Sequence, residues 1–151
     1  MEVLLASNTH ITKKSSREFL TQVRVIYADT DKMSVVYHGK YLEFFEIGRN
    51  EMLREVGFPY KRLESQGVYL PIIESHLKYF RPAQYDDLLT IKTHVVHDEV
   101  KPLRFQIYCK VFCENMLLTE GYTIHITTNS SGRPIKASKD LYNELIGKLY
   151  S

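Results

Sequence analysis

A single apolar stripe with helical spacing lies between residues 41 and 56, and it constrains the fold more than any other feature of the sequence. Its members recur at steps of three and four and so share one helix face: Tyr41, Phe44, Phe45, Gly48, Met52 and Val56. Gly57 and Pro59 form a stop signal directly after the stripe. Glycine inside a helix costs about 1 kcal/mol relative to alanine, so Gly48 predicts the close approach of another backbone.

The remaining segments are typical of strands. Apolar patterns predict strands near residues 18–27, 68–80, 88–97, 103–113 and 116–128, and a terminal helix near residues 138–150. Strands of ten or more residues twist and curl, and a helix with an aromatic stripe can fill such a curl. We therefore predict one α+β domain over residues 1–151, a long curved antiparallel sheet wrapped around one central α-helix. Residues 1–16 are expected to be a loosely ordered leader.

A short acidic turn, Asp29-Thr30-Asp31, precedes the helix by only a few residues. No Ser, Thr, Asp or Asn occupies the cap position around Tyr37-His38-Gly39, so the first N–H groups of the helix lack a side-chain acceptor. Such a helix start can receive an anion or a developing oxyanion. The segment thus combines a candidate base or nucleophile with a candidate oxyanion site.

Several runs of residues together resemble the signature of the hotdog-fold thioesterases, in the 4-hydroxybenzoyl-CoA thioesterase-like branch. The first runs surround the helix start: Arg24-Val25, Thr30-Asp31, Ser34-Val35, Tyr37-His38 and Tyr41. The later runs follow the helix: Pro71-Ile72-Ile73, Tyr79-Phe80-Arg81-Pro82-Ala83 and Tyr85-Asp86-Asp87-Leu88-Leu89. The resemblance implies the hotdog fold, hydrolysis of an acyl-CoA thioester, and no metal or cofactor other than coenzyme A as part of the substrate. Lys32-Met33-Ser34 departs from the usual small residues of the signature, which leaves the acyl preference open.

The resemblance also assigns roles around the turn. Asp31 matches the catalytic carboxylate, as nucleophile or general base, although the residues alone also fit an ordinary turn aspartate. The backbone N–H near His38 matches the group that polarises the thioester carbonyl, whereas the His38 side chain alternatively plugs a subunit interface. Asp29 either orients the turn or is solvated. Glu46, on the polar helix face, is a reserve carboxylate, since another branch uses a helical one. Alternatively it pairs with a basic neighbour such as Arg49 or is solvated.

Other candidates lie further along the chain. Glu74 interrupts an apolar strand and faces either the pocket or a subunit boundary. Tyr37 and Tyr41 are expected to line an aromatic acyl pocket or to belong to the core. Lys78 and Arg81 are candidates for binding the phosphates of coenzyme A, with a solvated surface position as the alternative.

Composition and missing motifs exclude several classes of function. A net charge of +2 gives no case for a nucleic-acid partner, and no apolar run is long enough to span a membrane. The sequence has no Gly-x-Ser-x-Gly elbow, and Cys109 and Cys113 are too far apart on one strand to form a disulfide. We predict a cytoplasmic homo-oligomer, a dimer or a tetramer. An acyl-carrier-protein thioesterase and a non-catalytic acyl-ligand binder remain the alternatives.

Overall fold

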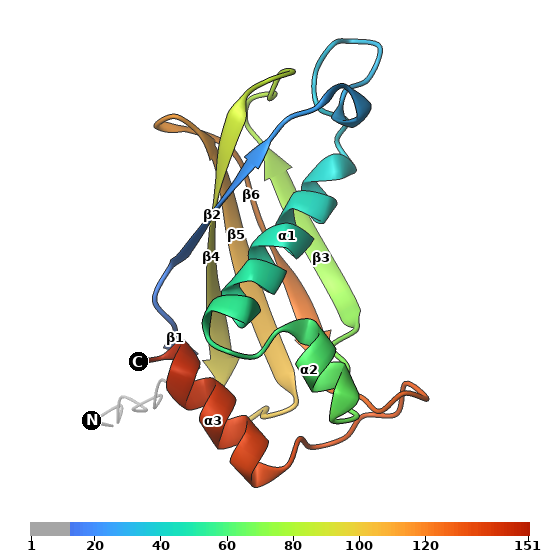
Figure 1. Ribbon diagram of the computed structural model, residues 1–151, viewed down its shortest axis with the longest axis vertical. Helices are drawn as coiled ribbons and strands as arrows, with labels where there is room; N and C mark the ends of the chain where they lie inside the picture. Colours follow the sequence, from blue (N-terminus) through green and yellow to red (C-terminus); the bar gives the residue numbers. More distant parts are fainter. Residues whose placement is uncertain (1–12) are drawn as a thin grey trace, which may run out of the picture.

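The computed structural model describes residues 13–151, and Figure 1 shows the arrangement of its elements. The strands are β1 (Lys13–Ser15), β2 (Phe19–Arg24), β3 (Ile72–Tyr79), β4 (Leu88–Asp98), β5 (Arg104–Cys113) and β6 (Met116–Ile126). The helices are η1 (Tyr27–Asp29), α1 (Lys40–Glu55), α2 (Tyr60–Ser65) and α3 (Lys139–Leu149). Residues 1–12 lie outside the described range. Of the leader expected over residues 1–16, the part that the structure describes includes β1, which pairs with β4.

The six strands form one antiparallel sheet in the order β1-β4-β5-β6-β3, and β2 also pairs with β4. Residues 88–93 of β4 pair with β2, whereas residues 96–98 pair with β1, so these two short strands share one edge. The opposite edge is β3, which pairs only with β6 among the described strands. The β5–β6 hairpin turns at the predicted position, where Glu114 has a φ of 54°.

Helix α1 lies across one face of the curved sheet, against β2, β4 and β5 (Figure 1). Every residue of the predicted apolar stripe is buried, and Leu53 joins it. The expectation for Gly48 is corrected in one respect. A Cβ at Gly48 would lie 2.6 Å from Thr93 Oγ1 and 2.7 Å from Ile91 Cγ2, so side chains of β4, and not another backbone, approach the helix there.

The core has two parts, one at each end of α1. Near the helix start, α1 packs with the loop before it and with the middle of the sheet, through residues such as Val36, Phe45 and Leu89. Near the helix end, α2 and α3 join the packing, and Phe58, Phe105 and Leu145 contribute to this part. The first part of the core therefore supports the loop that carries Asp31 and His38.

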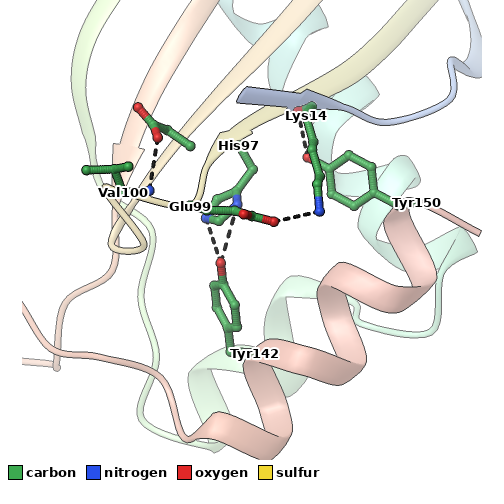
Figure 2. A network of polar contacts seen from close by, with 7 residues as sticks. Lys14, His97, Glu99, Val100, Tyr142 and Tyr150 are labelled. Atoms are coloured by element: carbon green, nitrogen blue, oxygen red, sulfur yellow. Dashed lines mark hydrogen bonds and ion pairs between the residues drawn. The ribbon is translucent and has the colours of Figure 1, made fainter. Parts of the chain in front are cut away.

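Polar contacts fasten α3 to the far end of the sheet (Figure 2). The Tyr142 hydroxyl lies 2.9 Å from Nε2 of the buried His97, and the Tyr150 hydroxyl donates to the Lys14 carbonyl. Lys14 also forms a 2.6 Å ion pair with Glu99. These contacts lie at the same end of the sheet as the second part of the core, away from the loop before α1. Among the helices of residues 13–151, none is long and apolar enough to cross a membrane.

Candidate active site

The loop between β2 and α1 is a small hairpin that folds back on itself. Thr30 and Val36 form an isolated antiparallel bridge, and the Asp31 N–H donates to the Val35 carbonyl at 2.9 Å. The Ser34 N–H donates to the Asp31 carbonyl at 3.0 Å, and Ser34 has a φ of 62°. A small residue is suited to this left-handed conformation, which explains why the departure from the family signature at Ser34 keeps the turn intact.

Asp31 is partly buried and presents one free carboxylate oxygen. Its Oδ1 accepts a 2.8 Å hydrogen bond from the Met33 N–H, which is the geometry of an Asx turn. Its Oδ2 makes no hydrogen bond or ion pair to any residue that the structure describes. The turn interaction therefore occupies one oxygen and orients the carboxylate, while the second oxygen remains available to a water molecule or a carbonyl carbon.

Asp29 has a different environment two residues earlier. It is 5% exposed; its Oδ2 accepts from the Ile26 N–H at 2.9 Å, and its Oδ1 lies 3.3 Å from Lys40 Nζ. The Asp29 carbonyl accepts from the Tyr37 N–H. Of the two alternatives for Asp29, orientation of the turn is the one that these contacts support.

The start of α1 has unpaired N–H groups. Gly39 is the N-cap residue, and no side chain caps the helix. The N–H groups of His38 and Gly39 have no hydrogen-bond acceptor among residues 13–151. The His38 carbonyl accepts from the Tyr79 hydroxyl at 3.0 Å, which holds the peptide in place, while the His38 side chain is exposed. The geometry is that of a preorganised site for negative charge at a helix start.

Lys40 adds a positive charge beside this helix start. Its Nζ donates to Glu43 Oε2 at 2.6 Å and lies 3.3 Å from Asp29 Oδ1. The hydrogen bond to Glu43, together with the nearby Asp29 carboxylate, raises the pKa of Lys40. Lys40 is therefore engaged with Glu43 and Asp29, and it forms no ion pair with Asp31.

The comparison with known proteins decides the family. Residues 25–145 match the sequence profile of the Thioesterase-like superfamily. The chain belongs to this superfamily. The acyl-CoA thioester hydrolase YbgC of Escherichia coli is 38% identical over 103 residues, which cover 68% of this chain and 76% of YbgC. The putative acyl-CoA thioesterase YneP of Bacillus subtilis is 33% identical over 86 residues, and the match covers 57% of each chain.

Solved structures of the superfamily have the same fold. The DHNA-CoA thioesterase of Staphylococcus aureus superposes with a TM-score of 0.79 at 30% identity, covering 87% of this chain and 89% of that enzyme. The predicted α+β hotdog architecture, a curved antiparallel sheet packed against one long helix, is confirmed.

Within this thioesterase fold, Tyr41 belongs to the core. It is 2% exposed, and its hydroxyl accepts from the Ala83 N–H at 3.2 Å. Burial raises the pKa of Tyr41. The assignment of Tyr41 to an acyl pocket is therefore replaced by its alternative, a core position. Tyr37 is 51% exposed beside His38, where its ring centroid lies 4.3 Å from the imidazole.

The structure does not bring Lys78 or Glu74 to the Asp31 loop. Because successive side chains of a strand alternate between faces, and Tyr79 reaches His38 on the α1 side, Lys78 points to the other face of β3. On that face its Nζ lies 5.3 Å from the Phe80 ring centroid. Glu74 shares this outer face and accepts from the Tyr122 hydroxyl at 3.2 Å. Arg81 follows β3 and is exposed.

Glu46 lies away from the turn. It is exposed on α1, six residues after Lys40, which corresponds to about 9 Å along the helix axis. It borders a cavity together with Arg49 but forms no ion pair with it, so of its alternatives the exposed, solvated position is the one that the structure supports. Glu46 does not share the hydrogen bonds that organise Asp31.

The cysteines and the remaining acidic and histidine residues form no evident metal site. No group of three or more His, Cys, Asp or Glu side chains in the described part of the chain is arranged to hold a metal ion. Cys109 and Cys113 are both free thiols. Burial raises the pKa of Cys109 to about 11, so this thiol is a packing residue and a poor nucleophile.

The sequence patterns did not predict the roles that two residues have in this region. Tyr79 holds the His38 carbonyl across 41 residues of sequence, and Arg49 lines a cavity beside α1. Tyr79 does lie in a run that matches the family signature, but nothing local to that run indicates its partner. For Arg49 a local pattern was present: it follows Glu46 by one helical turn, and this spacing places the two charged side chains on the same face of the helix.

Proposed function

We propose that this protein hydrolyses acyl-CoA thioesters, with the Asp31 carboxylate as the reacting group and the helix start at His38 as the oxyanion site. One observation supports this proposal above others: a carboxylate with a free oxygen lies on a short hairpin that leads directly into a helix start with unpaired backbone N–H groups. The names of relatives, acyl-CoA thioester hydrolase and DHNA-CoA thioesterase, support coenzyme A esters as the substrate class.

Two routes use the same groups. In the first, Asp31 takes a proton from water as the hydroxide attacks the thioester carbonyl. In the second, the carboxylate attacks that carbonyl directly, and water then hydrolyses the mixed anhydride. In both routes the developing oxyanion receives hydrogen bonds from the N–H groups at His38. The C–S bond breaks, the thiolate of coenzyme A takes up a proton, and the free carboxylic acid leaves.

Release of free thiol from a panel of acyl-CoA esters tests the proposal. We expect turnover of at least one ester without added metal, and persistence of turnover in the presence of a chelator. The same assay with these acyl groups attached to acyl carrier protein distinguishes a coenzyme A thioesterase from a carrier-protein thioesterase. A protein that binds these esters tightly but releases no thiol would instead be a non-catalytic acyl-ligand binder.

We further propose that the protein assembles through β3 into a dimer, or into a tetramer of two such dimers. The free edge of β3 exposes backbone N–H and C=O groups together with Ile72 and Ile73, which are 47% and 53% exposed. Such an edge favours pairing with another strand. The cytoplasmic location stays a prediction from the sequence.

A further inference from the structure

A cavity with both apolar and polar lining residues lies beside α1, and Asp31 and His38 are not among its lining residues. It has a volume of about 300 Å3 and lies between the second half of α1 and the segment that leads into β3. Leu70 and Ile72 contribute apolar walls, while Arg49 and Asn50 contribute hydrogen-bond donors. An apolar cavity with a few convergent polar groups is the usual form of a small-molecule site.

Arg49 is the principal charge of this cavity. Its side chain is partly buried, and burial lowers its pKa, although a guanidinium stays protonated at neutral pH. Its electrostatic neighbours are the buried Cys109 and His125 on the sheet and Glu46 on α1. No hydrogen bond or ion pair joins this guanidinium to any of residues 13–151. A cation in such a position has unused capacity for hydrogen bonds with an anionic oxygen.

The side chains around Arg49 in this cavity contribute more hydrogen-bond donors than acceptors. The Tyr60 hydroxyl accepts from the Leu70 N–H at 3.0 Å, and its own proton has no acceptor in the described residues. Asn50 supplies a carboxamide. Glu46 is the one acidic side chain that lines this cavity. It is exposed and forms no ion pair with Arg49, and its charge opposes the lowering of the Arg49 pKa by burial. The cavity therefore favours a ligand group that accepts hydrogen bonds.

The cavity and the helix start lie along the same helix. Arg49 follows Lys40 by nine residues, which corresponds to about 13 Å of helix axis. An extended acyl group whose thioester lies at the helix start can run beside α1 toward Arg49. Accordingly, we propose that Arg49, with Tyr60 and Asn50, binds a carboxylate at the far end of the acyl group, so that the enzyme favours ω-carboxyacyl thioesters over plain fatty acyl thioesters.

This inference rests on the proposed thioesterase function, so its test measures hydrolysis and binding separately. The probes are three matched pairs of esters: adipoyl- and hexanoyl-CoA, suberoyl- and octanoyl-CoA, and sebacoyl- and decanoyl-CoA. The kcat/KM of the wild-type protein is measured for each pair. Dissociation constants are measured on the Asp31→Asn variant, with and without Arg49→Gln. The wild-type preference itself needs no substitution at Arg49, so it remains a test even if Arg49→Gln folds poorly.

We expect the carboxylated ester of at least one pair to be preferred by about tenfold to a hundredfold, the usual effect of a charge-assisted hydrogen bond. Arg49→Gln should abolish that preference in both measurements. Arg54→Gln is the matched control, because Arg54 is exposed on the same helix and pairs with Glu51. This control should leave the preference unchanged.

The outcomes separate the two proposals. If no pair shows a preference, or if Arg49→Gln weakens both members of each pair equally, the carboxylate site is refuted while the thioesterase function stands. If no ester is hydrolysed but the binding preference depends on Arg49, the carboxylate site stands and the proposed hydrolysis is refuted.

Discussion

At the scale of single residues, two carboxylates two positions apart have distinct environments. Asp29 is buried and uses both oxygens, one with the Ile26 N–H and one beside Lys40. Asp31 is partly buried and uses one oxygen, with the Met33 N–H. The first carboxylate therefore maintains the hairpin, and the second has an oxygen free for chemistry.

Substitution of Asp31 by asparagine should remove most of the activity. The change keeps the shape of the side chain and the acceptor for the Met33 N–H, but removes the base or nucleophile. We expect a fall in kcat of about a hundredfold to ten-thousandfold, measured by release of free thiol, with little change in melting temperature. Glu46→Gln is the comparison, and it should retain most of the turnover. Near-normal turnover by Asp31→Asn, together with loss in Glu46→Gln, would move the chemistry to the helical carboxylate.

The buried His125 should make the fold less stable in mild acid. Its Nδ1 bonds to the Leu70 carbonyl and must be the donor, so in the neutral ring Nε2 accepts from the Thr123 hydroxyl. Burial lowers the pKa of His125 to about 4, below its usual value near 6.5. Between these two pH values the unfolded chain binds a proton that the folded chain does not, so stability falls as the pH decreases from about 6.5 to about 4.

The size and the source of this effect are both measurable. The loss attributable to His125 is at most about 3.5 kcal/mol, since one pKa unit corresponds to about 1.4 kcal/mol. Urea unfolding of the wild type and of His125→Gln across this pH range provides the measurement. The slope of stability against pH should be smaller in the variant. Equal slopes in the two proteins would assign the pH dependence to other groups, such as His97, whose pKa burial also lowers.

At the scale of elements, the contact between α1 and β4 sets how closely the helix approaches the sheet. Gly48 faces Thr93 and Ile91, two β-branched residues of β4 that are fully buried. β-branched side chains have little rotamer freedom in a packed core. The absence of a side chain at Gly48 therefore lets the helix axis lie close to the strand.

Gly48→Ala should destabilise the protein although alanine is the better helix former. The added Cβ would lie within 3 Å of both Thr93 and Ile91, and overpacking of this kind costs about 1–3 kcal/mol. Gly147→Ala in α3 is the matched control, because a Cβ there meets no atom within 4 Å. That variant should be stabilised by up to about 1 kcal/mol. Thermal or urea unfolding of the two variants gives the comparison, and equal stabilisation of both would contradict the close approach.

At the scale of the whole molecule, the two edges of the sheet differ. One edge is made of the short strands β1 and β2, which share β4. The other is the eight-residue β3, whose side chains are almost all exposed. Because α1 lies against β2, β4 and β5, the β3 side of the sheet has less helical cover (Figure 1). Assembly through β3 would cover this side.

A charge placed on β3 should dissociate the assembly. We expect the wild-type protein to sediment as a dimer or tetramer at micromolar concentration, and Ile73→Lys to shift it toward monomer, because a lysine at a buried seam must lose its hydration. Leu20→Lys is the control, since Leu20 is 62% exposed on β2 at the opposite edge. A wild-type monomer that still hydrolyses thioesters would contradict assembly through β3, as would dissociation by Leu20→Lys alone.

Much of the fold was predictable from local patterns. The long strands, α1 and α3 lie within a few residues of their predicted ranges, because the periods of helix and strand are properties of short segments. The same holds for the turn that carries Asp31, whose hydrogen bonds join neighbours in the sequence. The sequence by itself thus determined the class of fold and the hairpin that holds the candidate carboxylate.

The tertiary structure decided which distant residues meet that hairpin. The pairing of β3 with β6 brings Tyr79 to the His38 carbonyl and turns Lys78 to the other face of the sheet. Packing of α1 buries Tyr41 in the core and leaves Arg49 in a cavity without an ion-pair partner among residues 13–151. These outcomes depend on strand register and helix position, and a shift of one residue would reverse the face of every side chain on a strand. Such non-local choices follow from the packing of the whole chain, so no local stretch of sequence contains them.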